Sequence, residues 1–381
     1  MRKICFILTS KIHYSRSKLI LEELRRRPDV ALQIVVGASA ILKQYGDVES
    51  WLRDDGFKVN ARITMTLEGG SNVAMAKTTG VGIMEFATLF ENLDPDIVVV
   101  RADRYEVLAA AIAAAYMNKT VAHIEGGDIS GNIDETVRHA ITKMAHIHFA
   151  TNVDSRNRIL KMGELPEYVF DVGAPDVEFA ALSKETISNS DFHPVTLGYK
   201  VDLAENFLIL MQHPVTSEKG LNKNNMNASL QAILELGYPT LCFWPNIDAG
   251  TDEISNAIRH YREETAIDGH VGFIKYLPPA KFIALLKEAR CLVGNSSAGI
   301  KECSYLGIPV VNVGSRQNGR TRTENVLDVP HQSEIIKEAI LSQIKTGRFA
   351  PSQFYFKEST SKNIADILAT IPLYTQKRFV E

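Results

Sequence analysis

The sequence has few cysteines, and their arrangement excludes a disulfide framework. Four cysteines are spread over 381 residues, and each lies in or beside an apolar run. They are Cys5, Cys242, Cys291 and Cys303. This distribution favours buried free thiols in a reducing cytosol. Histidine and cysteine form no cluster with metal-ligand spacing, so the sequence predicts no bound metal.

Positive charge is not in excess, and long hydrophobic runs are missing. The formal net charge is −3, which provides no basic surface for nucleic acid or anionic lipid. The longest apolar run, 107–116, is alanine-rich and much too short to span a bilayer. The opening MRKICFILTS has too short an apolar run for a signal peptide and is predicted to be a buried strand. We therefore expect a cytoplasmic protein with neither a nucleic acid nor a membrane as partner.

Several motifs that mark common enzyme classes are absent. No G-x-G-x-x-G motif with a following acidic residue occurs, which argues against a nicotinamide cofactor. The Gly-Lys-Ser/Thr ending of a P-loop is missing, and so is the G-x-S-x-G motif of α/β-hydrolases. The sequence therefore predicts no cofactor.

Short apolar runs alternate with helical periods along the whole chain. Fully apolar strands in a βαβ alternation indicate parallel, doubly wound sheets. The predicted strands are 4–8, 31–36, 57–63, 96–100, 121–124, 147–150 and 169–172, then 207–211, 240–244, 271–274, 291–293 and 310–313. We expect an α/β protein with two Rossmann-like domains. Their predicted boundaries are 1–174 and 206–358, with a linker at 175–205 and, in 359–381, a helix that crosses back to the first domain.

Residues 121–139, VAHIEGGDISGNIDETVRH, are predicted to form a strand, a glycine turn and a helix. Asn132 followed by Glu135 has the spacing of a helix N-cap with its reciprocal partner. Glu125 and Asp134 stand on either side of the turn. Ligands of parallel sheets bind beyond the carboxyl ends of the strands. Because two carboxylates are costly to hold together unless proton chemistry uses them, this turn is a candidate site.

Further candidates follow other predicted strands. Asp103 and Arg104 come after the 96–100 strand, although Asp103 also fits the simpler role of a helix N-cap. Asp134 has a similar alternative, since an acidic residue in a first turn suits the helix dipole. No capping role explains Glu125. His213 follows the first strand of the second half, where it is either a core histidine or an acid, base or phosphate partner.

Residues 293–299, VGNSSAG, are predicted to form a strand, a turn of small residues and a helix N-terminus. Such a turn offers backbone N–H groups and a favourable dipole to a phosphate. Ser296 and Ser297 add hydroxyl donors. Arg316 and Arg320 follow the next strand, where they are suited to bidentate contacts with phosphate oxygens. The alternative is an ordinary turn with surface arginines.

Six segments resemble the hydrolysing UDP-N-acetylglucosamine 2-epimerases, including the epimerase half of the bifunctional animal enzyme of sialic acid synthesis. They occur in the family's order and cover nearly the whole chain. The segments are ADRYE (102–106), HIEGGDISGNIDETVRHAITKMAH (123–146), QHPVT (212–216), FWPNIDAG (243–250), GNSSAGIKE (294–302) and GSRQNGRTRTENV (314–326).

The resemblance implies a GT-B architecture with a cleft between the two domains. It also implies the following reaction. A base removes the C2 proton of a UDP-linked 2-acetamido sugar, UDP departs to leave a glycal, and water adds to give the free 2-epimer. It leaves open which carboxylate is the base. The matching catalytic positions are Asp103, Glu125, Asp134 and His213. The matching nucleotide or substrate positions are Lys11, Ser15, Arg104, Asn246, Ser296, Ser297, Gly299, Glu302 and Arg316.

The chain departs from the family's pattern around the implied site. It has Lys11 and His13 where much of the family has an arginine and an acidic residue, and Arg101-Ala102 where the family often has His-Gly. A UDP-2,4-diacetamido-2,4,6-trideoxyglucose substrate, as in legionaminic acid synthesis, is therefore an alternative to UDP-N-acetylglucosamine. A non-hydrolysing epimerase, a GT-B glycosyltransferase and a nucleotide-sugar sensor are further alternatives. We expect a UDP-sugar substrate, UDP as product, and a homodimer or homotetramer.

Overall fold

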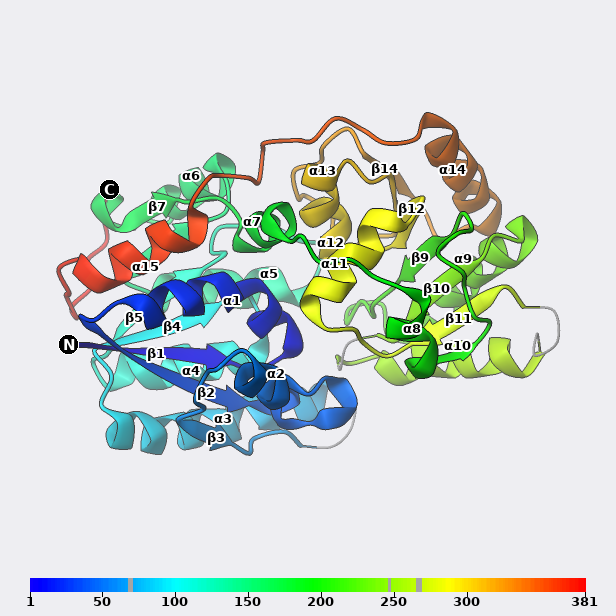
Figure 1. Ribbon diagram of the computed structural model, residues 1–381. Helices are drawn as coiled ribbons and strands as arrows, with labels where there is room; N and C mark the ends of the chain where they lie inside the picture. The colour runs from blue at the N-terminus through cyan, green and yellow to red at the C-terminus, as the bar shows by residue number, and fades with distance from the viewer. Residues whose placement is uncertain (68–70, 246–247, 265–268) are drawn as a thin grey trace. The chain divides into compact units, whose positions relative to one another are not determined.

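The computed structural model describes residues 1–67, 71–245, 248–264 and 269–381, which form two compact units. The first unit contains Met1–Ile129, Ile133–Phe179 and Tyr355–Glu381. The second contains Ser130–Asn132 and Ala180–Phe354. Each unit has one seven-stranded sheet with helices on both of its faces (Figure 1).

The sheet of the first unit is parallel throughout, in the order β3-β2-β1-β4-β5-β6-β7. Its strands are β1 (Arg2–Leu8), β2 (Val30–Gly37), β3 (Ala61–Ile63), β4 (Ile97–Arg101), β5 (Thr120–Ile124), β6 (Ile147–Ala150) and β7 (Val169–Asp171). The strand order reverses between β1 and β4. In doubly wound sheets, ligands bind at the carboxyl ends of the strands beside such a reversal.

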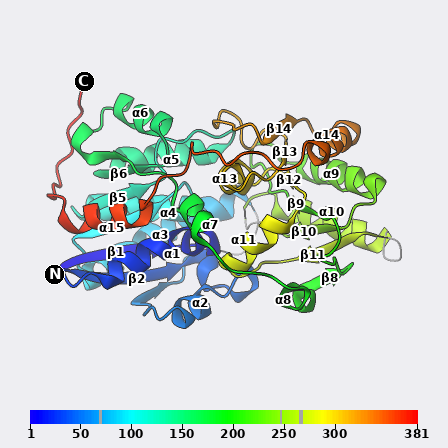
Figure 2. The same ribbon diagram turned by 45° about the horizontal axis from the view of Figure 1, so that its top comes forward.

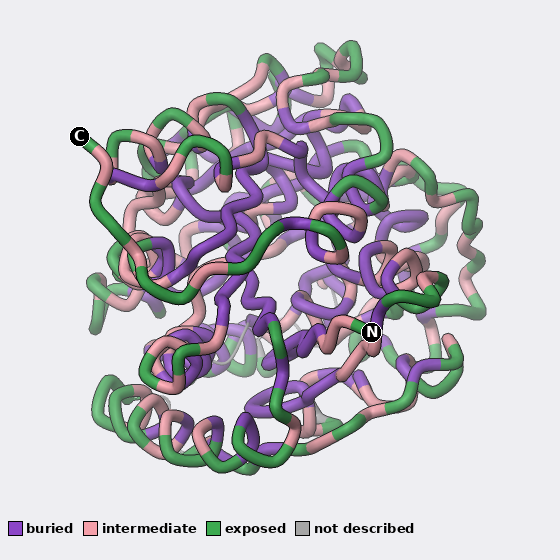
Figure 3. Tube along the Cα trace, turned by 90° about the vertical axis from the view of Figure 1, so that its left-hand side faces the viewer, coloured by how far each residue is buried: buried purple, intermediate pink, exposed green. Residues whose placement is uncertain are grey.

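Two apolar cores cover the two faces of this sheet. One contains α1 (Lys11–Arg26), α2 (Val48–Asp54) and α15 (Thr360–Thr370), and the other contains α3 (Asn72–Leu93), α4 (Tyr105–Tyr116) and α5 (Ile133–Met144). The remaining helical elements are η1 (Ala38–Ile41), η2 (Lys43–Tyr45), α6 (Val153–Lys161), η3 (Pro166–Tyr168) and α7 (Pro175–Leu182). Figure 3 shows that buried residues run through the interior of the trace, while outer helical turns carry the exposed ones.

Helix α15 packs on α1, although the two are far apart in the sequence (Figures 1 and 2). Ile364, Ala365 and Leu368 are buried in the same core as the apolar residues of α1. The guanidinium of Arg27 also pairs with Asp366 at 2.5 Å. The segment that begins at Tyr355 is therefore part of the first unit's core.

The sheet of the second unit has the order β14-β13-β12-β9-β10-β11-β8, and only β8 runs antiparallel to its neighbour among the pairs in the described residues. Its strands are β8 (Thr196–Gly198), β9 (Leu208–Met211), β10 (Thr240–Phe243), β11 (Val271–Ile274), β12 (Cys291–Gly294), β13 (Val310–Val313) and β14 (Val326–Val329). The order reverses between β9 and β12. The second unit therefore repeats the arrangement that places ligands at strand ends.

Apolar cores again cover both faces of the second sheet. The helical elements are α8 (Asn189–Phe192), η4 (His193–Val195), α9 (Asn222–Leu236), α10 (Thr251–Glu264), α11 (Pro279–Glu288), α12 (Ser297–Ile300), α13 (Glu302–Leu306) and α14 (Ser333–Thr346). Helices α9, α10 and α14 contribute to one core, and α11 contributes to the other.

The two doubly wound sheets confirm the predicted fold class. Two strands were not predicted from the sequence. β8 lies within 175–205, the range interpreted as a linker, and β14 is an edge strand with two exposed residues. The four cysteines are buried free thiols, as predicted. Across the described residues, none of the helices combines the length and apolarity that a bilayer crossing requires.

Candidate active site

Two residues beyond the carboxyl ends of adjacent strands in the first unit have backbone angles that are rare outside glycine. Ala102 follows β4 with φ of 61°, and Glu125 follows β5 with φ of 70°. Such conformations cost on the order of 1–3 kcal/mol each and concentrate at functional sites. The strand ends beside the order reversal are therefore strained at two neighbouring points.

Glu125 belongs to a buried network of ion pairs. Its carboxylate accepts a hydrogen bond of 2.8 Å from Nε of Arg101, whose side chain is fully buried. Arg101 also donates to Asp176 at 3.1 Å, and Arg16 lies 3.6 Å from the same aspartate. A buried charge is tolerated only when it is paired and hydrogen-bonded. The network therefore fixes the Glu125 carboxylate in place.

The glycine turn after β5 is needed because neighbouring segments approach it closely. A Cβ atom on Gly126 would lie 2.9 Å from the Thr142 hydroxyl. Gly127 has φ of 75°, and a Cβ atom there would lie 2.3 Å from the carbonyl oxygen of Ser155. The Gly-Gly pair thus lets the chain leave the strand at Glu125 and reach the start of α5.

Asp103 does not cap a helix, because the N-cap of α4 is Arg104. The Asp103 carboxylate instead pairs with the guanidinium of Arg138, a buried residue of α5. Arg138 also donates to the carbonyl oxygen of Asp128 at 2.9 Å. Asp134 lies in the first turn of α5 and is partly buried, one turn before Arg138. Helix α5 therefore brings its own acid and a partner for Asp103 to the same strand ends.

Basic and neutral groups from α1 and α4 complete this end of the sheet. Burial lowers the pKa of Lys11, in the first turn of α1, to about 8. Burial, together with the charges of Arg104 and Arg101, lowers the pKa of His13 to about 3, so this imidazole is neutral at physiological pH. Arg104 forms a bidentate pair with Glu106 at 2.9 and 3.0 Å. The hydroxyl of Ser15 donates to the carbonyl oxygen of Ile12 at 3.0 Å.

In the second unit, Asn295 joins three strand ends. Its side chain accepts a hydrogen bond of 2.7 Å from the backbone N–H of His213 and donates one of 2.9 Å to the carbonyl oxygen of the same residue. Its own carbonyl oxygen accepts from Arg316 at 3.1 Å and Gln317 at 2.9 Å. Asn295 follows β12, His213 follows β9, and Arg316 follows β13. Asn295 therefore positions two of the predicted site residues, His213 through its side-chain amide and Arg316 through its backbone carbonyl oxygen.

The small residues after β12 form a short helix start. Ser296 is the N-cap of α12, and its hydroxyl accepts from the backbone N–H of Ala298. Ser297 is the first residue of that helix, and Glu302 is a buried residue of α13. A Cβ atom on Gly299 would lie 2.8 Å from Val310, so this glycine permits close packing of α12 on β13.

The predicted residues thus form one set in each unit. Asn246 is the exception, because it lies outside the described residues. In the first unit the set is Lys11, Ser15, Asp103, Arg104, Glu125 and Asp134, at the ends of β1, β4 and β5 or on the helices that follow them. In the second unit it is His213, Ser296, Ser297, Gly299, Glu302 and Arg316, near the ends of β9, β12 and β13. Within the described ranges, no group of three or more histidine, cysteine or acidic side chains is arranged to hold a metal ion.

The sequence prediction missed four residues of these networks. Asp176 and Arg138 are the partners of Arg101 and Asp103, Asp128 contacts Arg138, and Asn295 joins the strand ends of the second unit. Arg138 carried a signal, since it is four residues after Asp134 on the same helix and therefore on the same face. Asp128 and Asn295 lie within the predicted turns 121–139 and 293–299, whereas nothing in the sequence pointed to Asp176.

Comparison with known proteins identifies relatives along nearly the full length of the chain. A family model described as UDP-N-acetylglucosamine 2-epimerase matches residues 22–369. A protein of Legionella pneumophila, UDP-N,N'-diacetylbacillosamine 2-epimerase (hydrolyzing), is 34% identical over 376 residues, which are 99% of this chain and 98% of the relative. The UDP-N-acetylglucosamine 2-epimerase of Neisseria meningitidis serogroup B is 28% identical over 387 residues, covering 100% and 99%.

Solved structures show the same fold. The Methanocaldococcus jannaschii UDP-GlcNAc 2-epimerase, solved in complex with UDP-GlcNAc and UDP, superposes with a TM-score of 0.78 at 17% identity. The match covers 96% of this chain and 99% of that one. At this identity the superposition establishes the arrangement of helices and strands.

Proposed function

The chain belongs to the UDP-N-acetylglucosamine 2-epimerase family, and from this premise we propose that it is a hydrolysing 2-epimerase. It acts on a UDP-linked 2-acetamido sugar and releases the free 2-epimer and UDP. The single observation that carries the proposal is the pair of carboxylates at the ends of β4 and β5, each held by a buried arginine.

The reaction has two steps. First, a carboxylate removes the proton from C2 of the sugar. The C1–O bond to UDP breaks, its electron pair stays on the diphosphate, and a C1=C2 double bond forms. In the second step water adds, with its hydroxyl going to C1 and a proton returning to C2 from the opposite face. The sum is one UDP-sugar plus one water giving one free 2-epimer plus UDP.

Glu125, Asp103 and Asp134 are the proposed acid and base groups. Proton transfer to carbon needs a carboxylate within hydrogen-bonding distance and in a fixed orientation. Arg101 fixes Glu125 through Nε, and Arg138 fixes Asp103. Two acids fixed at neighbouring strand ends suit removal of a proton from one face of C2 and its return to the other.

The second unit is proposed to bind the nucleotide. The hydroxyls of Ser296 and Ser297 and the guanidinium of Arg316 are suited to the negative charge that builds on a departing diphosphate. Glu302 is suited to accept hydrogen bonds from ribose hydroxyls. His213 lies at the end of β9 and is proposed to contact the substrate.

We propose UDP-2,4-diacetamido-2,4,6-trideoxyglucose as the preferred substrate. The support is the higher identity to the Legionella relative, 34% against 28% for the Neisseria enzyme, together with Lys11 and Arg101-Ala102 where the family pattern has other residues. UDP-N-acetylglucosamine is the second candidate, because the Neisseria relative is named as an epimerase of this sugar and aligns over 99% of its own length.

Product analysis in isotopically labelled water tests the proposal. With each UDP-sugar in D₂O we expect equal amounts of UDP and free 2-epimer, with deuterium at C2. In H₂¹⁸O, early samples should carry the label at C1. A stable mixture of two UDP-linked epimers without free sugar would assign a non-hydrolysing reaction, and free sugar without C2 deuterium would exclude the elimination.

A further inference from the structure

Residues 372–380 lie along the first unit and contact the end of α5. The ammonium of Lys377 donates to the carbonyl oxygens of Thr142 at 3.4 Å, of Lys143 at 2.9 Å and of Ala145. The last carbonyl groups of a helix have no partner within the helix, and their end of the dipole attracts a cation. Lys377 therefore caps α5 from a segment more than 200 residues away in the sequence.

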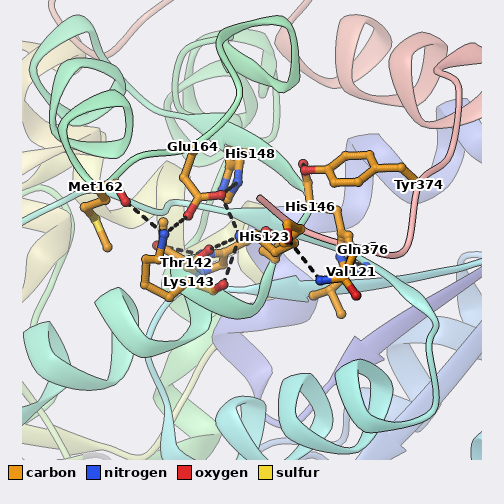
Figure 4. A network of polar contacts seen from close by, with 12 residues as sticks. Val121, His123, Thr142, Lys143, His146, His148, Met162, Glu164, Tyr374 and Gln376 are labelled. Carbon is orange, nitrogen blue, oxygen red and sulfur yellow. Dashed lines mark hydrogen bonds and ion pairs between the residues drawn. The ribbon is translucent and has the colours of Figure 1, made fainter. Parts of the chain in front are cut away.

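The same ammonium takes part in a charge cluster around the buried carboxylate of Glu164. Lys377 lies 2.5 Å from the Glu164 carboxylate, which also contacts Lys143 at 2.6 Å and His148 at 3.0 Å. Burial alone would raise the pKa of Glu164, but the hydrogen bonds from His148, Lys143 and Lys377 bring it down to about 2. Glu164 is thus a fixed anion that holds Lys377 at the helix end. Figure 4 shows the Glu164 carboxylate beside His148 and Lys143.

Tyr374 and Thr375 contact His146, which in turn contacts β5, the strand that leads to Glu125. The hydroxyl of Tyr374 donates to the carbonyl oxygen of His146 at 3.1 Å, and its ring meets the imidazole edge-on. Nε2 of that imidazole donates to the carbonyl oxygen of Thr375 at 3.0 Å, while Nδ1 accepts from the N–H of Val121 in β5. Figure 4 shows Tyr374 and His146 side by side next to Val121.

A line of contacts leads from the capped end of α5 to the proposed acids. Thr142, whose carbonyl oxygen accepts from Lys377, lies 3.2 Å from Nδ1 of His123 through its hydroxyl. Nε2 of His123 donates to the carbonyl oxygen of Ala102 at 2.8 Å. Asp103 comes next in the chain and pairs with Arg138, one helical turn before Thr142. Helix α5 is therefore tied to the β4 end at both Thr142 and Arg138.

We propose that Lys377 is a positioning residue for this reaction, which holds α5 in the register that places Arg138 and Asp134 at the strand ends. The inference rests on the proposed function of those strand ends. Without the ammonium, three carbonyl groups and the Glu164 anion lose a shared partner, and the C-terminal end of α5 is held less firmly against the sheet. A displacement of about 1 Å at reacting groups costs about 100-fold in rate, so a partial shift is visible as a loss of kcat.

Lys377→Met, Lys377→Arg and the matched control Lys143→Met form the test. Lys143 contacts the same carboxylate but belongs to α5 itself, so its removal leaves the cap in place. We expect Lys377→Met to lower kcat by about tenfold or more with KM nearly unchanged, because only the acids move. Lys143→Met should stay within about twofold of the wild type, and Lys377→Arg should recover most of the activity because it keeps a cation at the carbonyls.

Hydrogen exchange separates this inference from the proposed function. Amides in the last turn of α5, next to the lost cap, should exchange faster in Lys377→Met than in Lys143→Met, a result that needs no substrate. An active wild type with unchanged kcat in Lys377→Met overturns the positioning role, as does an equal kcat loss in the two methionine variants. A wild type that turns over no UDP-sugar overturns the proposed function, while the exchange experiment still decides whether Lys377 holds α5.

Discussion

The two strand-end regions have similar backbones but opposite chemistry. In the first unit the residues with positive φ after β4 and β5 are Ala102 and Glu125. In the second unit the corresponding positions with positive φ, at the end of β12 and directly after β13, are Gly294 and Gly314. Glycine adopts these angles without strain, whereas alanine and glutamate do not. The first unit therefore carries backbone strain at Glu125, where the proposed role requires a side chain, whereas the second unit has glycines at these positions.

The side chains around these turns also differ, because those of the first unit are charged and the central one of the second unit is neutral. Glu125 and Asp103 are held by the buried guanidinium groups of Arg101 and Arg138. In the second unit the central group is the neutral amide of Asn295. Ion pairs keep acids in place for proton transfer, whereas an amide can shape a loop without adding charge near a bound anion. This contrast supports the proposed division, in which the first unit carries the proton chemistry and the second binds the nucleotide.

The largest expected effect tests the chemical half of this comparison. Glu125→Gln keeps the size of the side chain but removes the proton acceptor, so we expect kcat to fall by about 10²–10⁴-fold. UDP affinity, measured by calorimetry, should remain within a few-fold of the wild type.

Glu178→Gln is the matched control. Glu178 is a buried carboxylate of the same unit, but it accepts hydrogen bonds from the backbone and hydroxyl of Ser361 rather than from an arginine. This variant should retain nearly full kcat. Comparable activity of the two glutamine variants would remove Glu125 from the catalytic set.

A smaller expected effect tests the proposal that the second unit binds the nucleotide. Asn295→Ala leaves the N–H and carbonyl of His213 without their partner, so we expect weaker UDP binding by about tenfold and a loss of about 1–3 kcal/mol of stability. Asn312→Ala is the control, since Asn312 is equally buried but donates to Asp328 at 2.6 Å. If both variants bind UDP equally well, Asn295 serves stability alone.

Much of the fold was predictable because central strands of parallel sheets are continuous apolar runs. The predicted bounds of β6, β11 and β13 agree with the structure residue for residue. Edge strands β8 and β14 were missed because they are short and partly exposed, so their sequences do not differ from those of loops.

The residues of the candidate site also fall into two groups, those that the sequence predicts and those that it does not. Asp103 and Glu125 could be found from the sequence because each follows an apolar run, and this position is fixed by local structure. Their partners could not, because tertiary packing selects them. Asp176 lies 75 residues from Arg101, and nothing local in either segment indicates that they meet. The sequence therefore predicted the candidate acids but not the charges that hold them.

The smallest expected effect concerns Lys11, a cation in the first turn of α1. Burial lowers its pKa from 10.5 to about 8. Below that pH the ammonium is available to pair with the substrate's diphosphate, and above it the amine is neutral. If Lys11 contacts the diphosphate, KM should rise by about threefold between pH 7 and pH 9.5, and Lys11→Arg should remove the rise because arginine stays charged.

A rise in pH should therefore weaken substrate binding but increase the stability of the protein. Between about pH 8 and 10.5 the unfolded chain keeps a proton on Lys11 that the folded chain has released. Unfolding then takes up a proton, so the contribution of Lys11 to stability increases with pH in this window and is constant below it. Lys11→Arg should lack this increase in melting temperature, whereas Lys18→Arg, a change on the same helix, should retain it. A KM that stays flat while the melting temperature shows the predicted increase would assign Lys11 to packing, and the first unit would then bind its substrate without this cation.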